Sequence, residues 1–400
     1  MSCLGTIRAM RIFARMLGRV PAGHLWYLLR RMRNEKPHRF AGQIRINTFF
    51  PPYPSIAFDR FLKAVTERRR VPYSTYLAVT SACPYRCPHC SYGRRRDVTL
   101  RREQALNIIS QVKTLGTATL GFTGGEPLLR GDLEELVSAA GPEMATIVFT
   151  TGWALDGPRA RRLAEAGVTC LTVGIESSDA GEHDSVRGAA GSFAKARDAV
   201  RVTREAGIYT AVSTIGTREK IASGELERMY RLAAEWGVGE FRLLAPVATG
   251  GAAGRGAFML SEDERRALYD FHVAHNRRRG GPAVACFAYL ESQEMFGCGA
   301  GYHHLFIDAG GEVSPCDLTP LSFGSAIDEP LSEIWRRMAS YFPLPRCECL
   351  MGELAGKLGG TAALPLGRRE SELICPARSP DEPLPEGYRR LAAASESPAR

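Results

Sequence analysis

The feature that most constrains the fold is a regular alternation of short β-rich runs and helical runs between residues 76 and 245. Six alternations predict a parallel sheet with right-handed crossover connections. Six units are too few to close an eight-fold barrel, so we expect an α/β fold, a partial (β/α)6 TIM-like barrel with functional groups at the carboxyl ends of its strands. The expected strands are residues 76–80, 119–123, 145–150, 169–175, 208–214 and 240–245, and the expected helices are residues 99–115, 132–140, 158–166, 193–206 and 224–236.

The rest of the chain divides around this barrel, which we place at residues 76–260. Residues 1–75 are expected to form a basic helical extension. One amphipathic helix is expected over residues 1–36, since Ile7, Met10, Phe13 and Leu17 recur at helical spacing, and an aromatic and proline-rich stretch follows it. Residues 261–375 begin with a helix near 261–279, followed by a hairpin whose loop, Asp308 to Gly311, contains two glycines. Residues 376–400 carry five prolines, and we expect a disordered tail there.

The charge of the chain is concentrated at its start. The net charge is +9, and residues 1–36 hold eight basic residues and one acidic residue. The remainder is nearly balanced, which argues against a nucleic-acid binder. The basic segment is either a solvated helix face or a contact for an anionic partner such as a lipid surface. No apolar run is long enough to span a membrane and no secretory signal is evident, so we expect a cytoplasmic protein, with peripheral membrane association as the alternative.

The eleven cysteines are grouped, and clustered thiols without a secretory signal predict metal chemistry in a reducing compartment. Cys83, Cys87 and Cys90 follow the first expected strand with the spacing Cys-x3-Cys-x2-Cys. Three thiolates on one loop suit a [4Fe–4S] cluster and leave one iron open for a ligand. A zinc site with His89 as the fourth ligand is the alternative that the local spacing leaves open.

This cysteine loop resembles the signature of radical S-adenosylmethionine (SAM) enzymes, and the ends of the next strands agree with it in order. Gly124 to Pro127 resembles that family's GGEP motif, and Thr151-Gly152 resembles a strand-end motif. Glu176-Ser177 followed by His183 to Gly188 resembles a segment that contacts the ribose and carboxylate of SAM, although Glu176 stands where a small residue is usual. The resemblance therefore implies a SAM site whose residues are Gly124, Gly125, Glu126, Pro127, Thr151, Glu176, Ser177 and Arg187.

The same resemblance implies the chemistry. The open iron of the three-cysteine cluster binds SAM, and an electron from a flavodoxin- or ferredoxin-like reductant cleaves it. The resulting 5′-deoxyadenosyl radical abstracts hydrogen from a substrate carbon. The protein then serves mainly to bind, orient and exclude water.

A second cysteine group lies near the C-terminus. The spacing from Cys298 through Gly311 to Cys316 resembles the opening of SPASM and Twitch domains, which hold auxiliary iron–sulfur clusters. That resemblance implies one auxiliary [4Fe–4S] cluster held in a Twitch-like module by Cys298, Cys316, Cys375 and one of Cys347 or Cys349. A zinc site that stabilises the hairpin is the alternative.

Together these features predict a radical SAM enzyme, of oxidoreductase type, that oxidises or cross-links a peptide or a small metabolite. The alternatives are a lipid-modifying radical SAM enzyme, an iron–sulfur electron carrier and a zinc-stabilised binding scaffold. Tyr302, His303 and His304 are candidate proton donors or hydrogen-bonding groups near the substrate, with aromatic packing as the other reading.

Overall fold

A computed structural model describes residues 10–358, 364–379 and 381–392. Its centre is a nine-stranded sheet in the order β11-β10-β3-β4-β5-β6-β7-β8-β9, in which every pair except β10 with β11 is parallel. The six expected strands are confirmed as the consecutive strands β3 to β8. Their bounds are Ser74–Thr80 (β3), Thr119–Gly124 (β4), Ala145–Thr150 (β5), Cys170–Gly174 (β6), Tyr209–Ile215 (β7) and Glu240–Leu244 (β8).

Three further strands extend this sheet at its two edges. β9 (Ala283–Cys286) pairs with β8, and β10 (His304–Ile307) pairs with β3. β11 (Val313–Ser314) forms the expected hairpin with β10. The sheet thus begins at β11 and ends at β9 without closing, which confirms the partial barrel.

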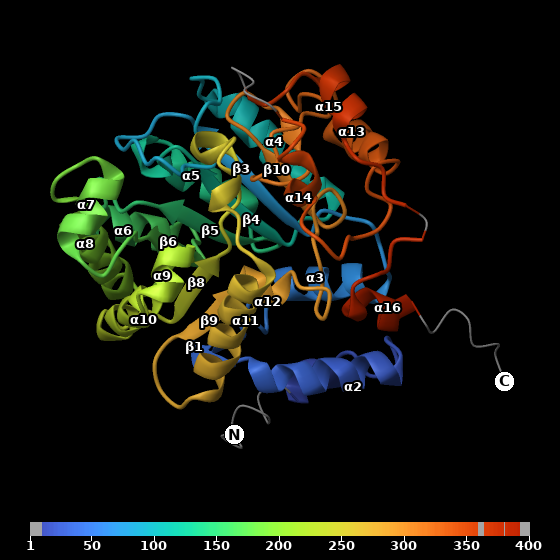
Figure 1. Cartoon of the computed structure of the whole chain (residues 1–400), viewed down its shortest axis with the longest axis horizontal. Coiled ribbons are helices and arrows are strands. Elements are labelled where there is room, and N and C mark those ends of the chain that lie inside the picture. The colour runs from blue at the N-terminus through green and yellow to red at the C-terminus, as the bar shows by residue number, and fades with distance from the viewer. Residues whose placement is uncertain (1–9, 359–363, 380, 393–400) are drawn as a thin grey trace.

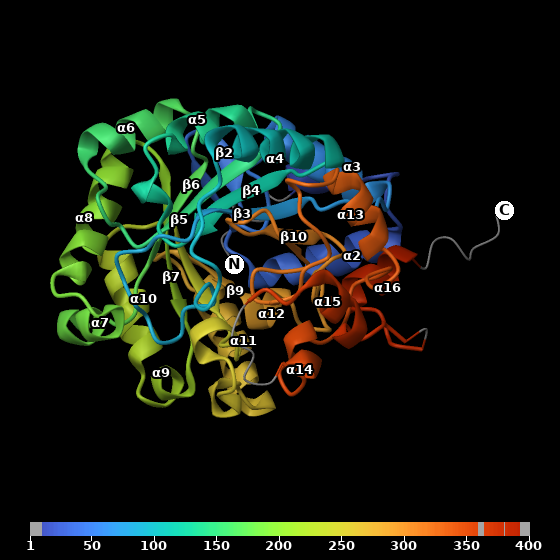
Figure 2. The ribbon, with the colours of Figure 1, turned by 90° about the horizontal axis from the view of Figure 1, so that it is seen from above.

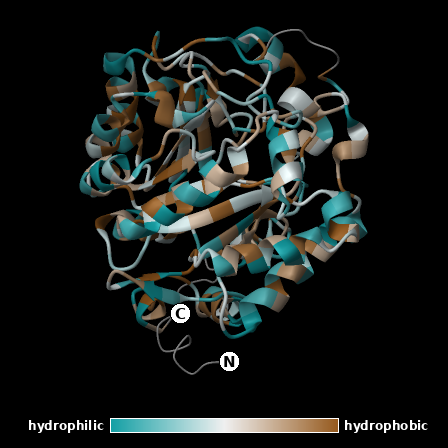
Figure 3. Ribbon diagram, turned by 90° about the vertical axis from the view of Figure 1, so that its left-hand side faces the viewer, coloured by the Kyte–Doolittle hydropathy of each residue, from teal (hydrophilic) through white to brown (hydrophobic). Residues whose placement is uncertain are grey.

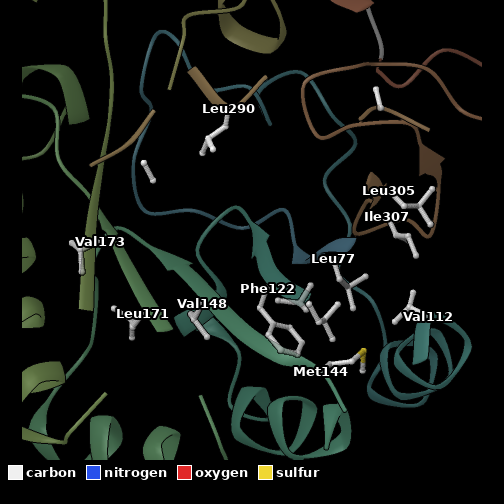
Figure 4. Close-up of a cluster of buried hydrophobic side chains, with 14 of the residues drawn as sticks. Leu77, Val112, Phe122, Met144, Val148, Leu171, Val173, Leu290, Leu305 and Ile307 are labelled. Carbon is white, nitrogen blue, oxygen red and sulfur yellow. The ribbon is translucent and has the colours of Figure 1, made fainter. Parts of the chain in front are cut away.

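Helices cover the outside of the sheet, as Figure 2 shows for α4, α5, α6, α8 and α10. Their apolar faces pack on outward-facing strand residues, so that Leu77, Phe122 and Val148 lie in the main core together with Val112 of α4 (Figure 4). Brown apolar and teal polar residues alternate along the helices in Figure 3, as expected for helices with one buried face. These helices are α4 (Arg102–Leu115), η2 (Pro127–Leu129), α5 (Leu133–Ala140), α6 (Gly157–Glu165), α7 (Ala180–Arg187), α8 (Ser192–Glu205), α9 (Arg218–Ala222) and α10 (Glu225–Glu235).

The N-terminal extension is helical only in pieces, so the expected continuous helix over residues 1–36 is wrong. Residues 10–14 are helical, but Gly18 has φ +73° and Pro21 ends the following turn, so a new helix begins after it. The expected apolar stripe is also corrected, because Ile12, Phe13 and Met16 are buried whereas Met10 and Leu17 are exposed. Ile7 lies outside the described residues. The elements are α2 (Ala22–Arg31), η1 (Met32–Asn34), β1 (His38–Phe40), β2 (Gln43–Arg45) and α3 (Ile56–Thr66).

The C-terminal part folds back over the barrel and the extension. Its elements are η3 (Gly250–Ala252), η4 (Gly256–Phe258), α11 (Glu262–Arg277), α12 (Phe287–Leu290), α13 (Leu331–Met338), α14 (Leu350–Leu354), α15 (Arg368–Ile374) and α16 (Glu386–Ala392). The expected disordered tail is wrong for residues 381–392, because α16 packs against α2 and buries Leu391 (Figure 1). Residues 380 and 393–400 lie outside the described part. None of the helices that the structure describes is long and apolar enough to cross a membrane.

Candidate functional site

The first cysteine group lies on the loop that leaves the carboxyl end of β3. Cys83 is exposed, and Cys87 and Cys90 are half-buried. Burial raises the pKa of Cys87. The positive charge of Arg187 lowers that pKa, and the negative charges of Glu176 and Cys90 raise it further. The three thiols are thus close enough to influence one another electrostatically, with a guanidinium beside them.

Glycines on two sides hold this loop in place. Gly124 has φ +122°, and a Cβ on Gly125 would overlap the carbonyl oxygen of Ala82. This tight approach lets the backbone N–H of Glu126 donate to that carbonyl at 2.8 Å. On the other side the N–H of Gly251 donates to the Cys90 carbonyl at 2.9 Å. The motif that follows β4 and the glycine-rich stretch after β8 therefore clamp the cysteine loop between them.

Glu126 lies behind the cavity wall and is fully buried. Its carboxylate accepts hydrogen bonds from the Thr150 hydroxyl, from both the backbone N–H and the hydroxyl of Thr151, and from the Leu128 N–H, at 2.5–3.0 Å. Burial raises its pKa, and these hydrogen bonds oppose the rise. Glu126 thus holds Thr151 at the end of β5, and its predicted place in the SAM site stays a prediction.

Glu176 and Arg187 form a buried pair that reaches the first cysteine group. Arg187 lies 3.0 Å from the Glu176 carboxylate, and its guanidinium donates to the Cys87 sulfur at 3.5 Å and to the Gly174 carbonyl at 3.0 Å. Burial by itself would raise the pKa of Glu176, but Arg187 and His89 outweigh it and hold that pKa well below its usual range. His89 pairs with Glu176 at 3.2 Å, so its ring is already engaged by a carboxylate rather than by the thiols.

A cavity of about 340 Å³ opens at the carboxyl ends of the strands. One side is formed by predicted SAM-site residues, namely Gly125, Thr151 and Arg187. The other predicted members, Gly124, Glu126, Pro127, Glu176 and Ser177, support the wall without lining it. Ser177 is engaged elsewhere, since its hydroxyl donates to Glu182 and Glu225.

The second cysteine group forms the opposite side of the same cavity. Cys298, Cys316 and Cys349 line it, whereas Cys347 and Cys375 do not. Backbone hydrogen bonds in both directions between Cys298 and Arg346 draw the segment containing Cys349 into place. A hydrogen bond to Cys349 and burial both raise the pKa of Cys298.

The two cysteines outside this group have other surroundings. The Cys347 thiol contacts the Pro383 carbonyl at 3.3 Å, and Cys375 is buried after α15, where burial raises its pKa to about 12. Of the two alternatives in the Cys-x-Cys pair, the structure thus brings Cys349 to the group. The structure does not place Cys375 beside Cys298, Cys316 and Cys349. Cys375 is predicted as a ligand only because of the resemblance to Twitch domains, which carries no geometric information.

The three candidate polar residues after Cys298 are separated by the fold. His304 faces the cavity, where its ring contacts Ser74 at 3.1 Å and Asp317 at 3.3 Å. His303 is stacked between Tyr73 and Tyr388, and its Nδ1 shares a hydrogen bond of 2.7 Å with the Tyr388 hydroxyl. Tyr302 lies outside this cavity. Only His304 is therefore placed as a polar group beside the auxiliary cysteines.

Three polar residues of this cavity were missed by sequence reasoning. One is Glu291, whose pKa is raised well above its usual range by burial and by the nearby Cys298 and Asp317. Asp317 and Arg242 also line the cavity. A signal existed for Arg242, because it stands two residues after Glu240 in β8, and charges buried in a strand need partners.

The donor sets fit iron–sulfur clusters better than zinc. Thiolates on tetrahedral zinc lie about 2.3 Å from the ion and hence about 4 Å from one another. Among the described residues only His304, Cys316 and Asp317 bring their ligand atoms within 4.8 Å of one another. Among the described residues neither cysteine trio is drawn together to the spacing of zinc, and Cys298, Cys316 and Cys349 have cavity space beside them.

Comparison with known proteins agrees with this geometry. Residues 77–233 match the family model of the radical SAM superfamily, and residues 298–342 match that of an iron–sulfur cluster-binding domain, SPASM. The chain is 32% identical over 284 residues to a PqqA peptide cyclase from Streptomyces rochei, covering 68% of this chain and 77% of the relative. It is 26% identical over 285 residues to an AdoMet-dependent heme synthase from Nitratidesulfovibrio vulgaris, covering 65% and 77%.

Solved structures show the same fold. Streptococcus suis SuiB bound to its precursor peptide SuiA aligns with a TM-score of 0.56 at 16% identity, covering 69% of this chain and 68% of SuiB. Native anSMEcpe with bound AdoMet, which is SAM, aligns with a TM-score of 0.54 at 15% identity, covering 80% of this chain and 96% of anSMEcpe.

Proposed function

Because this chain belongs to the radical SAM superfamily and carries a SPASM domain, we propose that it oxidises or cross-links a substrate held in the cavity between its two cysteine groups. Family membership makes the chain an enzyme that uses a [4Fe–4S] cluster, SAM and auxiliary iron–sulfur chemistry, rather than an electron carrier or a zinc scaffold. A flavodoxin- or ferredoxin-like reductant is the proposed electron source.

The observation that carries the proposal is that one cavity contains both halves of the site. Gly125, Thr151 and Arg187 line it together with Cys298, Cys316 and Cys349, and Arg187 connects it to the first cysteine group through its hydrogen bond to Cys87. A substrate between them would face both groups at once. Such an arrangement suits the removal of a hydrogen atom on one side and of an electron on the other.

The residues have separate tasks in this proposal. Cys83, Cys87 and Cys90 would hold the first cluster, and Cys298, Cys316 and Cys349 the auxiliary one. When bound, the first cluster and SAM supply a 5′-deoxyadenosyl radical, and the auxiliary cluster supplies an acceptor for the electron that the oxidised substrate gives up.

The surrounding side chains bind and orient. Thr151, positioned by Glu126, and Arg187, positioned by Glu176, would anchor the polar end of SAM. The aromatic side chains of Tyr76, Phe149 and Phe287 line the cavity and would exclude water. His304, which contacts Asp317, would receive the proton that accompanies loss of the substrate electron.

The relatives support two classes of substrate. The PqqA peptide cyclases and the solved complex of SuiB with its precursor peptide support a peptide. The heme synthases support a small metabolite. The likeness therefore supports the radical chemistry more strongly than either substrate class.

Anaerobic reconstitution tests the proposal. The wild-type protein, treated with dithionite and SAM, should release 5′-deoxyadenosine, and Cys83→Ala, Cys87→Ala and Cys90→Ala should each abolish the release. Cys298→Ala with Cys316→Ala should instead lower bound iron by about four atoms per chain, the content of one cube. Cys170→Ala, a buried barrel cysteine outside the cavity, is the matched control. Continued release after loss of the first trio would overturn the assignment.

A further inference from the structure

A second cavity, of about 320 Å³, lies beside the first. Ligand sites commonly have volumes of about 300–1,000 Å³ and are mainly apolar. This one is lined largely by aliphatic and aromatic side chains from both ends of the chain. They include Phe13, Met16, Leu28, Phe58, Leu62, Val65, Leu344 and Leu391.

The cavity belongs to elements that the barrel chemistry does not use. Residues 10–16, α2 and α3 come from the N-terminal extension, and α16 from the C-terminal end, and Figure 1 shows α2, α3 and α16 gathered below the barrel. α16 packs directly against α2. The two ends of the chain thus close around apolar space instead of filling it with side chains.

The two cavities share a wall. Phe50, Tyr73, Phe296 and His303 line both of them. The rings contact one another: Phe50 meets Phe296 at 6.1 Å between centroids, and Tyr73 stacks on His303 at 4.7 Å. Burial lowers the pKa of His303 to about 3, so the wall carries no charge at neutral pH. The two cavities are thus neighbours across a thin wall of uncharged rings.

Polar atoms form only a small part of the lining of this cavity, and two of the polar residues there are buried. His24 is 3% exposed and Glu35 8% exposed, and His24 Nδ1 and Glu35 Oε1 have no hydrogen-bond partner among the described residues. The lining is therefore mainly apolar, which suits an aliphatic chain.

We propose that the substrate is an amphiphile whose aliphatic chain occupies this apolar cavity, while the carbon that reacts lies in the adjoining cavity between the two cysteine groups. The inference rests on the proposed function and narrows its substrate class. A purely polar metabolite would leave the apolar cavity unused, and a peptide would need an equally long apolar stretch to fill it.

The outer surface of the extension is suited to such a molecule. Met10, Leu17 and Trp26 are 51–64% exposed and stand among the basic residues of the first 36 positions. Exposed apolar side chains interleaved with basic ones are typical of segments that lie on anionic membranes. A membrane lipid is therefore one source of the amphiphile, and a free fatty acid or its derivative is the other.

A binding experiment on the reconstituted protein tests the inference without requiring turnover. The probe is 11-(dansylamino)undecanoic acid, displaced by octanoic, decanoic or dodecanoic acid. Each methylene that enters the cavity should raise affinity about three- to fourfold. Leu28→Trp, which places bulk in the cavity, should weaken binding about tenfold, the effect of excluding about two methylenes. Leu373→Trp, on an exposed position of α15 outside both cavities, is the matched control and should bind as the wild type does.

The outcomes separate this inference from the proposed function. Affinity that does not depend on chain length, or that survives both Leu28→Trp and the milder Val65→Phe in folded protein, would overturn the inference even if 5′-deoxyadenosine is released. Displacement of the probe by a leucine-rich peptide but not by dodecanoic acid would also overturn it. Binding with the expected chain-length dependence but no SAM cleavage would overturn the proposed function alone.

Vesicles then identify the source. Sedimentation with phosphatidylglycerol vesicles, lost in Trp26→Asp, would support a membrane lipid. Binding of the fatty-acid probe without sedimentation would support a soluble amphiphile.

Discussion

Replacing Glu126 by glutamine should lower both the stability of the protein and its affinity for SAM, although the side chain keeps its size and shape. One carboxylate oxygen accepts from the Leu128 N–H at 3.0 Å and the Thr150 hydroxyl at 2.7 Å. The other accepts from the Thr151 N–H at 2.7 Å and the Thr151 hydroxyl at 2.5 Å. The amide nitrogen of glutamine must take one of these two positions, and in each it faces a backbone N–H.

The size of the effect follows from that conflict. A hydroxyl can rotate to accept from the new amide, but a backbone N–H cannot, so one buried donor is left unpaired in either orientation. Such a group costs about 1–3 kcal/mol. We therefore expect Glu126→Gln to lower the free energy of unfolding by about 2 kcal/mol. The control Glu165→Gln, at the exposed end of α6, should change it by less than about 0.5 kcal/mol.

The effect should depend on pH with a definite sign. Burial raises the pKa of Glu126 in the folded protein, so the folded state binds the proton more tightly than the unfolded state. The wild type must then lose stability as pH rises from the ordinary carboxyl value through the raised one. Glutamine does not titrate, so the difference between wild type and variant should be largest at low pH and smaller at neutral pH.

Urea denaturation under anaerobic conditions, followed by circular dichroism at several pH values, measures the free energy of unfolding and its dependence on pH. SAM binding by equilibrium dialysis should weaken in parallel, because Thr151 loses its positioning partner. A variant as stable as the wild type at every pH would refute this account of Glu126.

Three other predictions concern the same region. Cys349→Ala should lower bound iron by about four atoms per chain, whereas Cys347→Ala should leave iron unchanged; equal losses in iron analysis would contradict the assignment. Because Arg187 and His89 hold the pKa of Glu176 low, its contribution to stability should vanish as pH falls below the ordinary carboxyl value, and Glu176→Gln should flatten that part of the stability profile. The pKa of His303 is lowered to about 3, so stability should fall as pH drops below about 6.5, and less steeply in His303→Phe, as thermal unfolding across pH would show.

The barrel could be predicted from the sequence because its signals are local. Each strand from β3 to β8 is a short apolar run bounded by turn residues, and each following helix has its own apolar face. The residues Cys83, Cys87, Cys90, Gly125, Thr151 and Arg187 follow these strands in order. The topology of a parallel sheet is enough to bring their ends together.

The features that the sequence did not predict depend on contacts between segments that lie far apart in the chain. Nothing near Cys349 distinguishes it from Cys347, since the choice is made by the backbone pairing of Cys298 with Arg346. The segment that forms α16 was predicted as disordered because five prolines lie in residues 376–400, yet Leu391 is buried and Tyr388 half-buried where α16 packs on α2. The contact of Glu126 with Thr151 could not be predicted, because a motif shows which residues are present but not which way a buried carboxylate points.

The shared cavity itself follows from one long-range pairing. β10 adds to the sheet beside β3, so the hairpin that carries Cys316 continues the barrel instead of hanging from a linker. Contacts of two arginines stabilise this edge of the sheet. Arg95 forms a buried ion pair with Asp308 at 3.1 Å. The Arg70 guanidinium lies 4.0 Å from the centre of the Trp335 ring and donates to the Gly301 carbonyl at 2.6 Å. The separation of the two cysteine groups is therefore set by the register of a continuous sheet, which flexes far less than a linker between domains. A fixed separation would suit the proposed reaction, in which a substrate is attacked from one side and oxidised from the other. On this proposal the C-terminal module is part of the reaction site.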